Sequence, residues 1–464
     1  GVMLAMVPFN QQAHDSYFVV AHLHYVLVGG FVFPMLAAAY YWLPHITGRE
    51  SVHRISIPAF WLIFIGFNLT FFMMHLTGLM GMPRRIYTYP SNFGWDWLNL
   101  LSSVGGFILA IGFALFAVDL VLQFRFGKRY RRNPWNASTL DWAMPTRPTS
   151  YTFASLPKIE ERGDGLDPDR LGPALAAGNG YLGFVRNGRM ETVGVDMTTG
   201  RLEHVAILPG PTYLPLISAV LTGALVLCLL FKLYTGAAIL AVATLASFFL
   251  WSRPTGVKSD AGLVPVGRGE KALLDVEVNG SSSWWAMVFG LAADGTLFAS
   301  LLFGTLYLWL IAPGWPPSEI AEPTIWTWLA PAAVAVSSTA WRFCKRINAK
   351  GGNFTPMLVL TIVVDIVAIV FISLAIVALP DPRNHAHLAT AAALLGFGWI
   401  HATLGLLFGL NALMKTVDGY VSKRRNLPLR LASLWHDYTA ATAIVIGAML
   451  ALMPMLIGML EGVR

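Results

Sequence analysis

The chain contains about ten long apolar runs, each near the ~20 residues that a helix needs to cross a bilayer. Three of them lie at residues 17–43, 56–79 and 98–123, and a polar stretch follows at residues 125–210. Only 12% of all residues are charged, which is about half the proportion found in a soluble domain. We therefore predict an all-α polytopic membrane protein with a polar linker. The seven later runs lie at residues 211–231, 235–251, 284–311, 325–342, 356–379, 388–414 and 432–457.

Basic residues are concentrated in every second loop between these runs. The loops at residues 45–54, 125–132, 342–350 and 415–430 are basic, whereas the loops between them are acidic or neutral. Because basic loops stay on the cytoplasmic side of a membrane, we predict that the linker is cytoplasmic and that the C-terminus lies outside. The short connection at residues 232–235 predicts a helical hairpin.

Two histidines, His22 and His24, lie within the first apolar run, HDSYFVVAHLHYVLVGGFVF at residues 14–33. Side chains two residues apart on a helix point about 200° apart, so one metal ion cannot bind both of them. Two flat cofactors, one on each side of the helix, can each take one imidazole, and neutral imidazole is a common axial ligand of haem iron. The alternative is that both histidines hydrogen-bond to neighbouring helices and bind no cofactor.

One predicted outside loop, residues 81–90, breaks the charge rule because it carries Arg84 and Arg85. Arginine binds carboxylates through paired hydrogen bonds, so we predict that this pair holds haem propionates; the alternative is anchoring at the membrane interface. His14 and Asp15 lie at the outer end of the histidine-bearing run and suit a small cation such as Mg²⁺. The alternative role for Asp15 is that of a helix N-cap.

Other features of the composition exclude several classes of protein. The two cysteines, Cys228 and Cys344, lie far apart and suggest neither a disulfide framework nor a thiolate metal site. The net charge of +7 comes from residues beside the apolar runs and does not indicate nucleic-acid binding. The chain begins with Gly1 and no signal peptide precedes the first run, so we expect the C-terminal portion of a longer polypeptide.

The run HDSYFVVAHLHYVL resembles the tenth helix of subunit I of the haem–copper oxidases, the cytochrome c oxidase family. The runs FNLTFFMMHLTGLMGMPRRIYTYP and NPWNASTLDW are similar to its eleventh helix with the following loop and to a segment after its twelfth helix. The resemblance covers about residues 1–155. It implies that His22 is the axial ligand of the high-spin haem at the oxygen site, and that His24 is one axial ligand of the low-spin haem.

The same resemblance assigns the other candidate residues. Arg84 and Arg85 match the arginines that hold haem propionates, and His14 and Asp15 match positions that hold magnesium between subunits. Copper would be bound by the missing N-terminal part of subunit I and by a partner subunit. For His75, in the second run, we favour a structural role over packing near haem.

Residues 211–464 resemble subunit III of the same complex, which also has seven spans. SWWAMVFGLAADGTLFASLLFGTLYLWLIAPGWPP and SLWHDYTAATAIV are similar to its third and last helices. Residues 156–210 are predicted to form a polar cytoplasmic linker whose short β-like runs make a small sheet. Asp294 lies near the position of a buried acid of that subunit, and Asp365 receives no role beyond pairing with Trp or Ser on a neighbouring helix. His401 is expected to make an interhelical hydrogen bond.

The resemblance implies part of a respiratory oxidase in a bacterial or archaeal plasma membrane. The complete polypeptide would reduce O₂ to water with electrons from cytochrome c and would pump protons, with two haems, magnesium and copper as cofactors. The expected partners are subunit II, the missing part of subunit I, cytochrome c and membrane phospholipids, without nucleic acid. This fragment alone is expected to be inactive. The alternatives are a quinol oxidase or nitric oxide reductase of the same superfamily, and a non-catalytic membrane scaffold.

Overall fold

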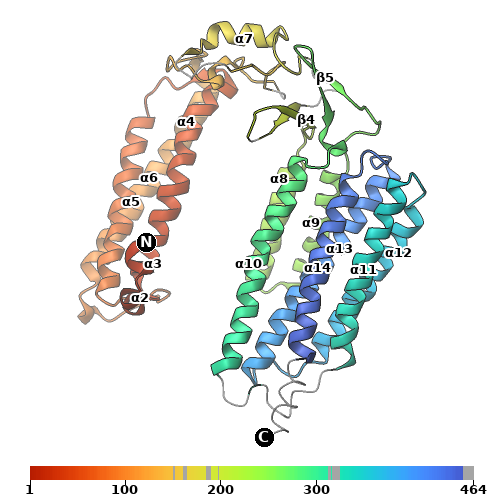
Figure 1. Ribbon diagram of the computed structural model, residues 1–464. Coiled ribbons are helices and arrows are strands. Elements are labelled where there is room, and N and C mark those ends of the chain that lie inside the picture. Colours follow the sequence, from red (N-terminus) through yellow and green to blue (C-terminus); the bar gives the residue numbers. More distant parts are fainter. Residues whose placement is uncertain are drawn as a thin grey trace. The chain divides into compact units, whose positions relative to one another are not determined.

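The computed structural model describes residues 1–149, 152–159, 165–183, 190–196, 198–311, 315 and 324–452. The chain divides into two compact units, unit 1 at Gly1–Asn179 and unit 2 at Gly180–Arg464. Long helices dominate both units (Figure 1), and seven of the described helices are long and apolar enough to cross a membrane. This confirms the predicted fold class of an all-α polytopic membrane protein. The predicted domain limits at residues 155 and 210 stay a prediction.

Unit 1 contains the three predicted spans of the first part. The first span combines α3, a π-helical turn at Val28–Val32 and α4, and the second and third spans are α5 and α6. The described elements are α1 (Val2–Ala5), α2 (Val7–Ala13), α3 (Tyr17–Leu27), α4 (Phe33–Thr47), β1 (Arg49–Glu50), α5 (Ser56–Leu79), α6 (Asp96–Phe126), β2 (Lys128–Arg129) and α7 (Pro168–Ala176), with 3₁₀ turns at Ser91–Phe93 and Leu140–Ala143.

Glycines let the spans of unit 1 approach closely. A Cβ atom at Gly66 of α5 would lie 2.4 Å from the backbone nitrogen of Leu109 in α6. A Cβ atom at Gly78 of α5 would lie 2.0 Å from the backbone nitrogen of Phe18 in α3. Small residues at such contacts are typical of packed membrane helices, because apolar lipid gives helices little reason to associate except close fit. Gly78 therefore fixes the start of α3 against α5.

Ser16, rather than Asp15, caps the first span. The Ser16 hydroxyl accepts a hydrogen bond from the backbone N–H of Phe18 at 3.2 Å, while Asp15 has a positive φ of 56° and lies outside the helix. The alternative N-cap role for Asp15 is therefore wrong. The physical reason is that the chain turns sharply at Asp15, so that the next residue is the first with its side chain directed at the free N–H groups of α3.

Unit 2 contains the seven later helices and a sheet. The helices are α8 (Leu214–Leu230), α9 (Tyr234–Ser252), α10 (Ser282–Ile311), α11 (Ile325–Ala349), α12 (Thr355–Val377), α13 (Ala386–Val417) and α14 (Leu427–Gly447), the last followed by a π-helical turn at Ala448–Leu452. The strands are β3 (Glu191–Val195), β4 (Leu202–Ile207), β5 (Val264–Gly267) and β6 (Glu270–Leu274), followed by a 3₁₀ turn at Asp275–Glu277. The predicted hairpin is confirmed as α8 and α9, joined at residues 231–233.

Helices α10 to α14 pack side by side as a five-helix bundle (Figure 1). By length and composition, the described part of the chain has seven helices that qualify as membrane spans; α8 is apolar but has only 17 residues, and α11 and α14 are too polar to qualify. The polarity of α11 and α14 has a structural explanation, because their polar side chains are directed into the bundle at Ser337, Ser338 and His436, each less than 5% exposed.

The sheet of unit 2 is larger than the sequence predicted. The β-like runs METVGV and HVAILPG are confirmed as β3 and β4, which pair antiparallel. The run GYLGFV lies partly outside the described residues. Strands β5 and β6 were not predicted; they come from the connection between α9 and α10, and β6 pairs in parallel with β4. The sheet order is β3-β4-β6-β5.

We predict that Gly78→Ala destabilises unit 1, because the added methyl group would overlap the backbone of α3. Overpacking of this kind costs about 3 kcal/mol at the upper end of the usual range. Thermal unfolding of the purified protein measures the effect. The matched control is Gly106→Ala in α6, where an added Cβ would meet nothing within 4 Å. A Gly78→Ala protein as stable as the control would show that α3 and α5 are not in close contact.

Candidate functional site

The two histidines of α3 flank the face with which this helix packs on α5. Phe18 and Ala21 form that face and are 7% and 0% exposed. At about 100° per residue, His22 and His24 lie on either side of it. Both side chains are half-buried. One helix thus presents two imidazoles in different directions, each beside α5.

His24 has a defined hydrogen bond and stacking partner. Its Nδ1 lies 2.7 Å from the backbone oxygen of Val20, four residues earlier in the same helix. A carbonyl oxygen only accepts hydrogen bonds, so Nδ1 carries the proton and Nε2 carries the lone pair. The ring stacks on Phe71 of α5 with a centroid distance of 4.2 Å and an interplanar angle of 13°. No other described residue hydrogen-bonds to Nε2.

His22 makes no hydrogen bond within the described part of the chain, and its ring lies beside Gly1. The neighbouring His75 of α5 packs edge-on against Phe18 and Tyr25, at centroid distances of 5.0 and 5.4 Å. The Nδ1 atom of His75 is buried and has no hydrogen-bond partner among the described residues. His75 belongs to the aromatic contact between α3 and α5, whatever binds at His22.

The loop after α5 closes over the start of α3. The backbone N–H of Arg84 donates to the oxygen of Asp15 at 2.8 Å, and the N–H of Tyr17 donates to the oxygen of Met82 at 2.9 Å. The Arg84 guanidinium forms an ion pair with the Asp15 carboxylate, whose other oxygen lies 3.4 Å from Nε2 of His14. The structure therefore brings together three of the predicted residues, namely His14, Asp15 and Arg84.

Arg85 is oriented differently from Arg84. It is exposed, has a φ of 68°, and makes no ion pair with a described residue. The Nε atom of Arg84, in contrast, is buried and has no hydrogen-bond partner in the described part of the molecule. A carboxylate placed here would satisfy that donor, so the pair fits a propionate although Arg84 already contacts Asp15.

The residues of α3 also fit a haem. Axial ligation needs a neutral imidazole whose outward nitrogen is free, and a hydrogen bond from the other nitrogen to a carbonyl fixes that tautomer. His24 makes this hydrogen bond through Nδ1, and its Nε2 has no partner among the described residues. Apolar residues beside the histidines are exposed, with Leu23 at 47% and Val26 and Leu27 at 57% each, so an apolar surface is available for a flat apolar cofactor.

A first polar cluster of unit 2 joins α10, α13 and α14. Nε2 of His401 lies 2.9 Å from Oδ2 of Asp294, and the Tyr438 hydroxyl donates to the same oxygen at 2.5 Å. Nδ1 of His401 lies 2.7 Å from the oxygen of Phe397. The imidazole ring stacks on the ring of Phe397 and on the ring of Trp435, at centroid distances of 3.8 and 5.3 Å. The expected interhelical hydrogen bond of His401 is confirmed.

A second polar cluster lies inside the bundle. The Ser337 hydroxyl donates to Asp365, which confirms the expected serine partner, and Nε2 of His436 lies 3.2 Å from Oδ1 of Asp365. The side chains of His436 and Asp365 are 5% and 4% exposed. Gly405 gives the His436 ring room on α13. The sequence did not identify His436 as the partner of Asp365; the packing of α11 against both α12 and α14 brings the two residues together.

The fold and these sites define a polytopic membrane protein with polar side chains paired inside apolar helices. Comparison with known proteins adds that residues 1–108 match the family model described as cytochrome c and quinol oxidase polypeptide I. The chain is 44% identical over 169 residues to cytochrome c oxidase subunit 1 of Alkalihalophilus pseudofirmus, covering 36% of this chain and 26% of that protein.

Two further relatives are similar over the same share of the chain. Quinol oxidase subunit 1 of Bacillus subtilis is 42% identical over 165 residues, covering 35% of this chain and 25% of that protein. Cytochrome c oxidase subunit 1 of Synechocystis is 43% identical over 159 residues, covering 34% and 28%. The chain thus spans about a quarter of the length of the curated relatives it matches.

We predict that His436→Ala strongly destabilises unit 2, because it leaves the buried Asp365 carboxylate without its imidazole partner and with the Ser337 hydroxyl as its remaining described partner. Breaking one side of a buried pair costs about 3–5 kcal/mol. Thermal unfolding of His436→Ala, Asp365→Asn and the double variant measures the coupling, and the double variant should lose much less than the sum of the two. Asp381→Asn, at an exposed pair with Arg383, is the control and should change little. Additive losses in the double variant would contradict the pairing.

Proposed function

We propose that residues 1–155 form the last three spans of subunit I of a haem–copper oxidase. The complete polypeptide would reduce O₂ to water with electrons from cytochrome c and pump protons. Two observations support this proposal. Residues 1–108 match the oxidase family model, and His24 holds its proton on Nδ1 against Val20, which leaves Nε2 without a partner among the described residues.

His22 and His24 each act as an axial haem ligand in this proposal. When bound, the haems supply the iron that carries electrons and binds oxygen. The chain's own residues orient the imidazoles: Val20 fixes the tautomer of His24 and Phe71 fixes the plane of its ring. The contact of Phe18 with α5 sets the direction in which His22 leaves the helix.

Arg84 and Arg85 would bind the haem propionates, and His14 with Asp15 would hold magnesium. Mg²⁺ takes one or two carboxylates and keeps several waters, so Asp15 supplies only part of its shell. The rest would come from water and a partner subunit such as subunit II. Because Asp15 also pairs with Arg84, the cation and the propionate would be connected through this one carboxylate.

Residues 211–464 would be a subunit III-like part, joined through a cytoplasmic linker at residues 156–210. The support is the count and order of α8 to α14 and the two polar clusters that join helices of the α10–α14 bundle. In the complete complex, copper would be bound by other parts of the oxidase, and membrane phospholipids would contact the apolar helices of this part. The chain alone would be inactive, because oxygen reduction needs the copper.

The central test is the haem spectrum of the intact oxidase. His24→Ala should remove or alter the low-spin haem signal and leave the high-spin haem bound, because only one of the two irons loses its ligand. His22→Ala should do the reverse and abolish oxygen reduction. His53→Ala is the control, since His53 lies exposed in a loop. Unchanged spectra in both helix variants would remove the basis of the proposal.

The propionate role has its own test in redox titrations. Arg84→Met and Arg85→Met should lower a haem potential, because removing a cation near the propionates favours the oxidised, more positive iron. The Coulomb energy of such a charge is about 4 kcal/mol or less in a partly hydrated site. Haem potentials equal to those of the wild-type protein in both variants would contradict the propionate role and favour the alternative, in which the arginines anchor the loop at the membrane interface.

The proposed orientation places the basic loops inside the cell and the C-terminus outside. In a variant whose native cysteines are replaced by alanine, a cysteine at Asn384 should react with an impermeant thiol reagent in intact cells, whereas one at Lys423 should not. Both positions are exposed, so burial does not explain a difference. Labelling at Lys423 but not at Asn384 would show that the orientation is the opposite of the proposed one. Arg84 and Arg85 would then lie on the cytoplasmic side.

Quinol is the second candidate electron donor, because the relatives include both cytochrome c oxidases and quinol oxidases at nearly equal identity, 44% and 42%. Oxygen uptake by the intact complex with reduced cytochrome c, compared with a soluble quinol, separates the two. Activity with quinol and none with cytochrome c would replace the donor in the proposal without affecting the haem ligands.

A further inference from the structure

Among the described residues, the polar contacts between the α8–α9 hairpin and the five-helix bundle lie at one end of the hairpin. Among the described helices, α9 packs broadly against α8 alone. The two are joined along their length by contacts such as that between the Ser218 and Ser247 hydroxyls, 2.8 Å apart and buried. The polar contacts between the hairpin and the five-helix bundle cluster at the C-terminal end of α9. The α8–α9 turn lies at the opposite end.

Lys415 of α13 binds the end of α9. Its Nζ donates to the backbone oxygens of Ser252 and Thr255 and to the Thr255 hydroxyl, each at 2.8 Å, and the residue is 7% exposed. The last carbonyls of a helix lack partners within the helix and carry a partial negative charge, so an ammonium group is well suited to them. Lys415 therefore caps α9 from another helix.

Asp418, three residues after Lys415, binds the next residue of the hairpin. Arg253 donates to both oxygens of Asp418, at 2.8 and 3.0 Å, and this pairing holds the pKa of Asp418 below its usual range. The Ser252 hydroxyl also donates to Oδ1 of Asn411 at 3.2 Å. Asn411, Lys415 and Asp418 are spaced at intervals of four and three residues and so share one face of α13.

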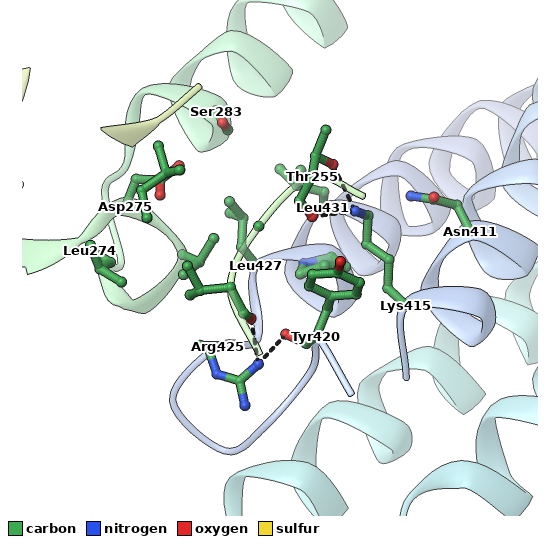
Figure 2. Close-up of a pocket in the computed structure, with 15 residues that line it drawn as sticks. Thr255, Leu274, Asp275, Ser283, Asn411, Lys415, Tyr420, Arg425, Leu427 and Leu431 are labelled. Atoms are coloured by element: carbon green, nitrogen blue, oxygen red, sulfur yellow. Dashed lines mark hydrogen bonds between the residues drawn. The ribbon is translucent and has the colours of Figure 1, made fainter. Parts of the chain in front are cut away.

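A cavity of about 270 Å³ lies beside these contacts. Figure 2 shows Lys415 and Thr255 on one side of it and Leu274 and Asp275 on the other. Burial raises the pKa of Asp275, chiefly through desolvation. Leu274 of β6 and Asp275 of the turn after it thus line the cavity opposite Lys415. Because the cavity separates these residues from Lys415, the described polar contacts to the end of α9 come from α13.

Away from this end, the surfaces of the hairpin and the bundle are apolar. Ile239 and Val242 of α9 are 66% and 69% exposed, and Phe289 and Phe303 of α10 are 66% and 69% exposed. Apolar helix surfaces in a membrane gain little from touching each other rather than lipid. No hydrogen bond or ion pair between residues that the structure describes therefore fixes the distance between the α8–α9 turn and the far end of α10.

We propose that Asn411, Lys415 and Asp418 form a polar latch about which the α8–α9 hairpin pivots. The latch fixes the separation of the hairpin and the bundle at the C-terminal end of α9. The apolar end at the α8–α9 turn moves towards and away from α10. This conformational device is independent of the proposed oxidase function, because it rests on contacts within unit 2 alone.

The test measures the distance between the two far ends by pulsed electron spin resonance. Nitroxide labels are placed at Tyr234, at the start of α9, and at Leu310, near the end of α10, in the full chain in lipid nanodiscs with both native cysteines replaced by alanine. Both positions are exposed, at 68% and 81%. Lys415→Met should roughly double the width of the distance distribution, because α9 loses its cap and one fixed end.

Lys350→Met is the matched control, because Lys350 is exposed at the C-terminal end of α11 and makes no described contact with α9. It should leave the distribution unchanged. If Lys415→Met does not accumulate, Arg253→Gln with Asp418→Asn weakens the same latch through the Arg253–Asp418 ion pair and should broaden the distribution. A distribution as narrow as wild type in every latch variant would overturn the proposal and show that the hairpin is held along its length.

Discussion

The buried carboxylates of the described helices pair with polar side chains inside an apolar environment. Water is absent from the centre of a bilayer, so an unpaired carboxylate or imidazole there costs several kcal/mol. Asp294 and Asp365 satisfy this requirement through histidines on other helices. Asp119 of α6, 0% exposed, accepts from the Ser51 hydroxyl at 2.8 Å. The pairs of Asp294 and Asp365 also fix register, because each one can form at only one relative position of its two helices.

Glycine contacts supply the complementary constraint in unit 1. Apolar side chains alone leave the helices free to slide, whereas a glycine facing a backbone permits an approach that no other residue allows. Gly66 and Gly105 join α5 to α6 in this way, and Gly78 joins α5 to α3. The position of α3 then determines where His22 and His24 lie. Gly78 therefore helps to position the candidate site, although it contributes no side chain to it.

The sequence predicted the features that depend on local patterns. Runs of apolar residues located all the helices that later appear as α3 to α6 and α8 to α14, and Lys232 marks the hairpin turn. The parallel pairing of β4 with β6 was not predictable in this way, because it joins His204 to Leu273 across two intervening helices. The basic loop at residues 415–430 predicted a cytoplasmic side from its charge, but nothing local indicated that Lys415 caps a distant helix.

The candidate site shows the same limit. Spacing alone put His22 and His24 on different faces of a helix, but it gave no account of what each imidazole contacts. Phe71, which orients His24, and Ser16, which caps the helix, carry no motif that marks them. The pairing of Asp15 with Arg84 links two segments that the sequence treats as separate sites. A contact between distant segments depends on packing, which periodicity does not encode.

Three histidines of this chain share one local geometry and differ in what lies beyond it. In His24, His401 and His436, Nδ1 lies 2.6–2.7 Å from the carbonyl oxygen four residues earlier in the same helix. This hydrogen bond satisfies Nδ1 within the same helix, without a partner from a neighbouring helix, and directs Nε2 away from the helix. In His401 and His436, Nε2 faces a carboxylate, so the imidazole is a structural partner. In His24, no described residue occupies that place, although the same cost of an unsatisfied polar atom applies. The hydrogen bond of Nδ1 therefore does not distinguish a structural histidine from a metal-ligating one. The partner of Nε2 makes that distinction.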